Sequence, residues 1–182
     1  MKTFCLSSLL LIFAIGTSKA DTFTFVPDDR PLTIYVDEEP PSVVQCALTM
    51  FCDDYKYVFG DSPQRVNRDK ADIIVECSEN GEWEHFDISV SRQGRLHVKG
   101  SDPRGTAYGI LELSRLIGIS PWVWWADVPP QKLSSYTLPA GYHNSQQPSV
   151  QYRGIFINDE DYGLNPWSWK THEPESDKGE IG

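Results

Sequence analysis

Helical periodicity in two stretches of the chain is the feature that most constrains its fold. Apolar or small residues recur at the three- and four-residue spacing of one helical face in residues 42–55 and again in residues 103–117. The first stretch places Val44, Ala47, Leu48, Phe51 and Tyr55 on that face, and the second places Ala107, Ile110, Leu111, Ser114 and Ile117 there. Such helices bury their apolar face against another layer of structure. We therefore expect both to pack on a sheet.

Short strand-like segments surround the two helices and supply that sheet. Residues 22–26, 32–36 and 71–75 are rich in β-branched, aromatic or other apolar side chains. Residues 86–90 and 96–98 alternate apolar and polar side chains on either side of a turn-forming Gly94, which predicts a hairpin. After Pro130 the composition becomes polar, and residues 136–138 alone are strand-like before the linker. The predicted fold class is α/β: an N-terminal domain of α+β character, with helices packed on a mixed sheet.

The second helix has clear boundary signals. Ser101 or Asp102 can cap its N-terminus, Pro103 fits its first turn, and Gly118 fits its end. Gly105 and Gly109 would let the helix lie close to the sheet. The free N–H groups of its first turn, together with Arg104, could also bind an anion. Capping and packing account for the same residues without a ligand, so both interpretations stay open.

The N-terminus has the pattern of a secretory signal peptide. Lys2 gives a positive start, residues 4–16 are apolar, and Ser18 and Ala20 are small residues at the positions that a signal peptidase reads. The apolar run is shorter than a membrane-spanning helix requires. We expect cleavage after Ala20 and export to the periplasm or the extracellular space. The predicted domains are then a signal peptide (1–20), an α/β domain (21–145) and a linker with the start of a further domain (146–182).

Net charge excludes some partners. The full chain carries −10, from 16 basic and 26 acidic residues, and loss of Lys2 and Lys19 with the leader makes it about −12. This balance disfavours nucleic acid, whose phosphates need a basic surface, and a membrane surface after signal cleavage. An anionic ligand would need local positive charge, for which Arg104 and Arg153 are candidates.

Cysteine and histidine positions predict neither a metal site nor a cofactor. Cys46, Cys52 and Cys77 remain after cleavage. On one helix, Cys46 and Cys52 would be separated by a rise of ~9 Å, beyond the reach of a disulfide, so buried thiols are expected. Four scattered histidines, at positions 85, 97, 143 and 172, show no zinc-ligand spacing.

Two segments combine aromatic rings with short carboxylates and amides. Residues 122–130 and 152–167 contain four of the six tryptophans. An aromatic ring stacks on the C–H face of a sugar, and Asp, Glu or Asn side chains bind its hydroxyls, so the pairing favours a carbohydrate site. Tryptophans that fill a core would give the same composition.

Three motifs in order resemble one enzyme family. Residues 100–114, 121–129 and 152–167 are similar, in sequence and spacing, to the N-terminal part of glycoside hydrolase family 115. The resemblance runs from about Ala71 to the C-terminus. It implies a xylan α-1,2-glucuronidase, which removes glucuronic acid or its 4-O-methyl form from xylan side chains. It also implies that the chain is truncated, since such enzymes continue for several hundred residues through a barrel.

Residues 152–157 are expected to form the first strand of that incomplete (β/α)₈ barrel, because polar functional groups collect at the C-terminal ends of barrel strands. The acidic cluster that follows allows several interpretations. Asp159 and Asp161 lie on one side of one strand and so do not flank a scissile bond as a catalytic pair must. The helix-loop-helix calcium pattern fails at Lys170, where a bidentate Glu is required. A different oxygen-rich cation site, binding of sugar hydroxyls and a purely structural loop all remain open.

The expected substrate-binding residues are therefore Trp125, Asp127, Arg153, Asn158, Asp159, Glu160 and Trp167. The family's catalytic acid and base are expected on later strands, beyond Gly182. The leading functional hypothesis is the N-terminal fragment of a secreted α-glucuronidase, inactive alone, with a xylan-derived carbohydrate as partner. The alternative is a noncatalytic carbohydrate-binding or docking module.

Overall fold

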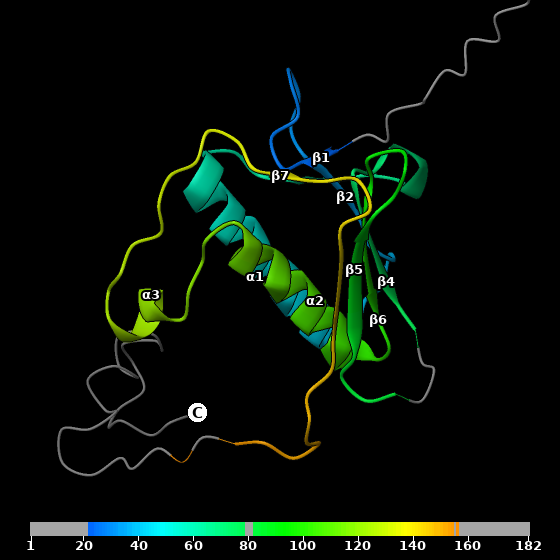
Figure 1. Ribbon diagram of the computed structural model, residues 1–182, viewed down its shortest axis with the longest axis vertical. Coiled ribbons are helices and arrows are strands. Elements are labelled where there is room, and N and C mark those ends of the chain that lie inside the picture. Colours follow the sequence, from blue (N-terminus) through cyan, green and yellow to red (C-terminus); the bar gives the residue numbers. More distant parts are fainter. Residues whose placement is uncertain (1–21, 79–81, 155, 157–182) are drawn as a thin grey trace, which may run out of the picture. The chain divides into compact units, whose positions relative to one another are not determined.

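The computed structural model describes residues 22–78, 82–154 and 156. The chain divides after Pro148 into two compact units, 1–148 and 149–182. The first unit contains all the helices and strands described below, which are shown in Figure 1. Among the described residues, no helix is long and apolar enough to cross a membrane.

A mixed six-stranded sheet is the framework of the first unit. Its strands are β2 (Thr33–Tyr35), β3 (Gln64–Arg65), β4 (Ile73–Cys77), β5 (Phe86–Val90), β6 (Leu96–Gly100) and β8 (His143–Gln146), in the spatial order β3-β2-β4-β6-β5-β8. The first four strands in that order are parallel to their neighbours, whereas β5 is antiparallel to both β6 and β8. The predicted hairpin and the predicted mixed sheet are confirmed.

Two helices lie side by side on one face of this sheet, α1 (Ser42–Phe59) and α2 (Pro103–Leu116) (Figure 1). The buried residues of α1 include all five of the predicted apolar face and extend it to Val58. The helix ends at Gly60, whose φ of +87° suits a residue without a Cβ atom. A 3₁₀ turn (Arg68–Lys70) leads into β4.

The core lies between the helices and the sheet. Phe86, Ile88 and Val90 of β5 are buried, while the residues between them face the other side and stay partly exposed. Buried aromatic rings from α1 and the N-terminal segment meet there, including Phe51 and Phe25. The Tyr55 hydroxyl donates a 2.6 Å hydrogen bond to the Phe25 carbonyl oxygen, and burial raises the pKa of Tyr55 to about 12.

The N-terminal strand differs from its prediction. Only Phe23–Thr24 forms β1, and this strand pairs with β7 (Thr137–Leu138) in a separate two-stranded antiparallel sheet. Strand β7 was predicted from its composition. Strands β3 and β8 were not, because the segments that form them are polar: β3 is exposed, and β8 is largely so. Their pairing partners, rather than their own side chains, make them strands.

The barrel strand predicted for residues 152–157 is not confirmed. Residues 152–154 and 156 form no strand, and the remaining residues of the predicted barrel strand lie outside the described part of the chain.

Cys46, Cys52 and Cys77 are free thiols, but Cys46 is exposed, so the expectation of buried thiols is wrong for that residue. It lies on the solvent side of α1, a position that the helical spacing of the apolar residues could have indicated.

Candidate functional site

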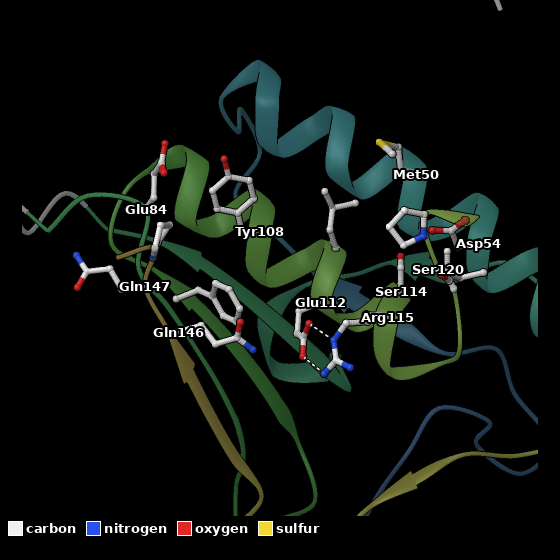
Figure 2. Close-up of a pocket in the computed structure, with 15 residues that line it drawn as sticks. Met50, Asp54, Glu84, Tyr108, Glu112, Ser114, Arg115, Ser120, Gln146 and Gln147 are labelled. Carbon is white, nitrogen blue, oxygen red and sulfur yellow. Dashed lines mark hydrogen bonds and ion pairs between the residues drawn. The ribbon is translucent and has the colours of Figure 1, made fainter. Parts of the chain in front are cut away.

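A groove of about 580 Å³ runs along α2 within the first unit (Figure 2). Helix α1 contributes one wall, and β5 with the end of β8 contributes the other. The loop that follows α2 closes one end. The groove is lined by Met50, Asp54, Glu84, Phe86, Tyr108, Leu111, Glu112, Ser114, Arg115, Ile119, Ser120, Pro121, Gln146, Gln147 and Pro148.

The N-terminal cap fixes where α2 begins. The Asp102 carboxylate accepts a 2.6 Å hydrogen bond from the Gly105 N–H and a 2.9 Å bond from the Glu84 N–H. The predicted capping role of this residue is confirmed. Because the same side chain holds the Glu84 backbone, it also fixes the segment that leads into β5.

Glycines on α2 fix its distance from the sheet. A Cβ atom on Gly105 would lie 2.2 Å from the carbonyl oxygen of His85, and one on Gly109 would lie 2.7 Å from a methyl group of Val98. Real Cβ atoms do not come so close to other atoms. The predicted role of these glycines in close packing is therefore confirmed, and the resulting approach of α2 sets the depth of the groove.

An ion pair between two residues of α2 lines the groove. Arg115 donates two hydrogen bonds of 2.6 and 2.5 Å to the Glu112 carboxylate, which also accepts a 2.9 Å bond from the Asn144 side-chain amide. Glu112 is only 7% exposed. The hydrogen bond to this carboxylate raises the pKa of Arg115 above its ordinary value. These contacts satisfy a buried charge that would otherwise be costly, and they tie α2 to the edge strand β8.

A second buried carboxylate lies at the rim near the start of α2. Glu84 is 4% exposed and pairs with Arg104 across 3.1 Å. Arg104 was a candidate to bind an anionic ligand at this helix N-terminus. In the structure its charge faces Glu84, and the Asp102 carboxylate accepts a hydrogen bond from the Gly105 N–H in the first turn of the helix. Capping and packing are therefore the observed roles of this end of the helix.

The Asp54 carboxyl and the Ser114 hydroxyl also line the groove, after the Glu112 and Glu84 ion pairs. Burial raises the pKa of Asp54 above its ordinary value, and the neighbouring Ser114 hydroxyl only partly offsets this. Ser114 is 3% exposed, and its Oγ makes no hydrogen bond of acceptable geometry within the described chain. Sequence reasoning missed this pair, because Asp54 lies among polar residues of α1 and Ser114 had been assigned only to the packing face of α2.

Two of the carboxylates that line the groove are engaged by arginines. Glu84 and Glu112 each hold an arginine, so neither is placed as the proton donor or nucleophile of glycoside cleavage. Its walls are largely apolar, with a few carboxylates and amides at the edges. Nowhere in residues 22–78, 82–154 and 156 do three potential metal-ligating side chains gather.

The structure describes only some of the predicted sugar-binding residues. Helix α3 (Trp122–Trp125) is a single turn, on which Trp122 is 63% exposed. The Trp125 side chain lies outside the described atoms. Asp127 follows in the left-handed region, with φ of +51°, and its side chain is exposed. The Val128 N–H closes the turn by donating to the Trp122 carbonyl oxygen at 3.2 Å.

The remaining predicted residues belong to the second unit. Arg153 is exposed, and its guanidinium donates a 2.7 Å hydrogen bond to the Val150 carbonyl oxygen. Asn158, Asp159, Glu160 and Trp167 lie outside the described residues. Their expected contacts with a sugar therefore stay a prediction.

The fold is shared with solved structures of low sequence identity. The N-acetyl-β-hexosaminidase of Streptomyces plicatus matches with a TM-score of 0.54 at 13% identity, over 74% of this chain and 26% of the other. The enzyme of Streptomyces coelicolor matches with a TM-score of 0.53 and the same identity and coverage. At this identity the likeness concerns the fold alone: a two-helix, mixed-sheet domain that also occurs within larger hexosaminidase chains.

A much closer likeness then identifies the family. A family GH115 4-O-methyl-α-glucuronidase with specificity for decorated arabinogalactans matches with a TM-score of 0.77 and 41% identity, over 88% of this chain and 23% of the other. The glycosyl hydrolase family 115 model matches residues 145–180. A comparison with curated proteins finds no match. The chain belongs to glycosyl hydrolase family 115, and it spans about a quarter of the length of the solved structures it matches.

Proposed function

We propose that this chain is the N-terminal portion of an exported α-glucuronidase that releases glucuronic acid, or its 4-O-methyl form, from glucuronoxylan. The observation that carries the proposal is 41% identity over 88% of the chain with a 4-O-methyl-α-glucuronidase of the same family. That relative is specific for decorated arabinogalactans, so a 4-O-methylglucuronic acid group on another polysaccharide is the competing substrate.

In this proposal the described domain does not perform the chemistry. Glycoside hydrolysis uses two carboxyl groups on either side of the scissile bond, and the buried carboxylates of the groove are engaged by arginines. The acid and base lie beyond Gly182. The segment from Trp125 to Asp127 and the residues Arg153, Asn158, Asp159, Glu160 and Trp167 contribute contacts to the sugar.

Export is part of the proposal. The positive start, short apolar run and small residues before Asp21 support cleavage after Ala20. N-terminal sequencing of the exported protein tests it, and a mature product that still begins at Met1 would contradict it.

The activity is tested with two proteins. One is residues 21–182, and the other is the product of the reading frame extended past Gly182. We expect the extended protein to release 4-O-methylglucuronic acid from glucuronoxylan, and residues 21–182 to release none above a buffer control. Decorated arabinogalactan is assayed in parallel. Release from neither polysaccharide, with binding to glucuronoxylan retained by residues 21–182, would favour the noncatalytic module instead.

Two substitutions test the proposed sugar contacts. Loss of one charged acceptor for a buried hydroxyl costs about 1.5–3 kcal/mol, so Asp159→Asn in the extended protein should lower kcat/KM by roughly tenfold to a hundredfold. Glu160→Gln provides the neighbouring comparison. Unchanged kinetics in both variants would remove this segment from the site, and a parallel fall in Tm would assign it a structural role.

A further inference from the structure

Two turns of the first unit carry a group of cations in an otherwise acidic chain. Residues 68–70, the 3₁₀ turn before β4, and residues 91–95, the turn between β5 and β6, contain four basic side chains and one acidic side chain. The full chain, by contrast, carries a net charge of −10. We call the four cations the basic patch: Arg68, Lys70, Arg92 and Arg95.

Hydrogen bonds hold the two turns together. The Arg95 guanidinium donates to the carbonyl oxygens of Arg68, at 3.4 Å, and of Asp69, at 2.5 Å. The Arg68 guanidinium carbon lies 5.7 Å from the centre of the Tyr35 ring. Tyr35 is flanked by buried neighbours on β2, so its ring faces away from the core. Arg68 therefore lies on the sheet face opposite α1 and α2 (Figure 1).

Much of the charge of the patch is not neutralised by carboxylates. Arg68 pairs with Glu76 at 2.7 Å, whereas the Arg95 guanidinium bonds to carbonyl oxygens. Lys70 and Arg92 are exposed and form no ion pair within the part of the chain that the structure describes. The positive charge that an anionic ligand needs is therefore present on these two turns.

His97 of β6 reports the local electrostatic environment. Burial lowers the pKa of its imidazole, the charge of Glu76 opposes this, and the charges of Arg68 and Arg95 lower the pKa further. Two cations of the patch therefore lie near the same imidazole, although they come from turns that are far apart in sequence.

The polar side chains around the cations indicate the chemistry of a ligand. Asn67 precedes the first turn and Gln93 lies within the second, and both are exposed. Guanidinium and ammonium groups bind carboxylates, and amides hydrogen-bond to hydroxyls. A ligand that complements this surface is a hydroxyl-rich polymer with carboxylates along it, which is the chemistry of the polysaccharide in the proposed function.

We infer that the basic patch is a binding surface for the glucuronate carboxylates of glucuronoxylan. This inference rests on the proposed function, because that function supplies the polysaccharide. Lys70 and Arg92 provide charge to the polymer, while the contacts of Arg68 and Arg95 fix the two turns. A surface of this kind raises the local concentration of an anionic substrate at a chain that would otherwise repel it.

Binding of residues 21–182 to glucuronoxylan, measured by isothermal titration calorimetry, tests the inference. We expect the affinity to fall at least about fivefold between roughly 0.01 and 0.15 M NaCl, because the Debye length shortens from about 30 to about 8 Å. The matched ligand is glucuronoxylan whose carboxyl groups have been reduced to alcohols, which keeps the polymer and removes its charge. Equal affinity for the reduced polymer would overturn the inference.

Single substitutions locate the binding surface. Lys70→Gln and Arg92→Gln each remove one exposed charge, so the Tm should not change. We expect each to raise the Kd for glucuronoxylan about two- to fivefold, the range for an exposed charge pair. Lys56→Gln is the matched control, because it removes the same charge from an exposed position on α1. An equal loss of affinity in Lys56→Gln would show that net charge alone matters and would overturn the patch.

Other polymers test the choice of ligand. Single-stranded DNA that binds more tightly than glucuronoxylan would overturn the carbohydrate assignment, and binding of decorated arabinogalactan alone would overturn the assignment of xylan. Release of glucuronic acid is measured separately. An extended protein that releases none but binds through the patch contradicts only the proposed function. Release without charge-dependent binding by residues 21–182 contradicts only the inference about the patch.

Discussion

The Cα atom of Gly105 packs directly against the backbone of His85, so that a Cβ atom there would lie 2.2 Å from the His85 carbonyl oxygen. This contact joins the first turn of α2 to the segment that enters β5. The obstructing atom belongs to the backbone, which cannot rotate away as a flexible side chain can. The separation of helix and sheet, and with it the shape of the groove, therefore depends on the absence of a side chain at position 105.

Replacing this glycine should destabilise the domain. We expect Gly105→Ala to lower the free energy of unfolding by about 1–3 kcal/mol, the usual cost of overpacking, despite the higher helix propensity of alanine. Urea denaturation followed by circular dichroism measures the change. Gly154→Ala is the matched control, because a Cβ atom there meets nothing within 4 Å. Equal stability of the two variants would show that the backbone at His85 yields without cost.

The cap of α2 gives a second prediction. Asp102→Ala removes the acceptor of two backbone N–H groups, one of them in the helix and one at Glu84. The loss of an N-cap costs about 0.5–2 kcal/mol, and the second orphaned N–H places the expected value in the upper half of that range. Asp102→Asn keeps an acceptor oxygen and should retain most of the stability. The same denaturation assay distinguishes the two, and an equal loss in both variants would contradict the capping explanation.

A third prediction concerns acid stability through Asp72. Burial alone would raise the pKa of this carboxyl, but hydrogen bonds from Arg30 and Thr33, together with the charge of Arg30, lower it below its ordinary value. A lowered pKa in the folded state stabilises the protein at pH values above the unfolded pKa of about 3.9, and this stabilisation is lost as pH falls through the folded pKa.

The matching measurement is the Tm of wild type and Asp72→Asn from pH 7 down to pH 2. The variant should be less stable at pH 7, and the difference should shrink below about pH 4. Arg30 is half exposed, so added salt should reduce the effect only in part. A Tm difference that stays constant across the range would show that the carboxylate charge is not responsible.

Asp54 should behave in the opposite way. Burial raises the pKa of its carboxyl, so the charged form is less favourable in the folded than in the unfolded state. Its contribution to stability is therefore greatest at low pH and is lost as pH rises from the unfolded pKa through the folded pKa. In residues 21–182, Asp54→Asn should raise the Tm at pH 7 and have less effect at pH 3. A lower Tm at pH 7 would indicate that the carboxylate makes a favourable contact in the groove.

Local sequence signals determined the helical part of this fold. The apolar spacing in α1 and α2 is set by the period of the helix itself, and the cap at Asp102 acts within four residues, so neither depends on distant parts of the chain. The hairpin of β5 and β6 was likewise predictable, because its partners are close in sequence and alternate in polarity. The three family motifs were visible in the order of residues alone.

Tertiary structure alone decided the edges of the sheet and the groove. Strands β3 and β8 carry no strong strand signal, and they exist because β2 and β5 offer unpaired backbone groups to them. Arg104 had the sequence setting of an anion-binding residue, but the fold brought Glu84 to it from 20 positions away. Asp54 and Ser114 lie on two different helices, and no local pattern predicts that they are neighbours. Periodicity along a chain reports which face of an element is buried, whereas long-range pairing determines which polar groups meet there.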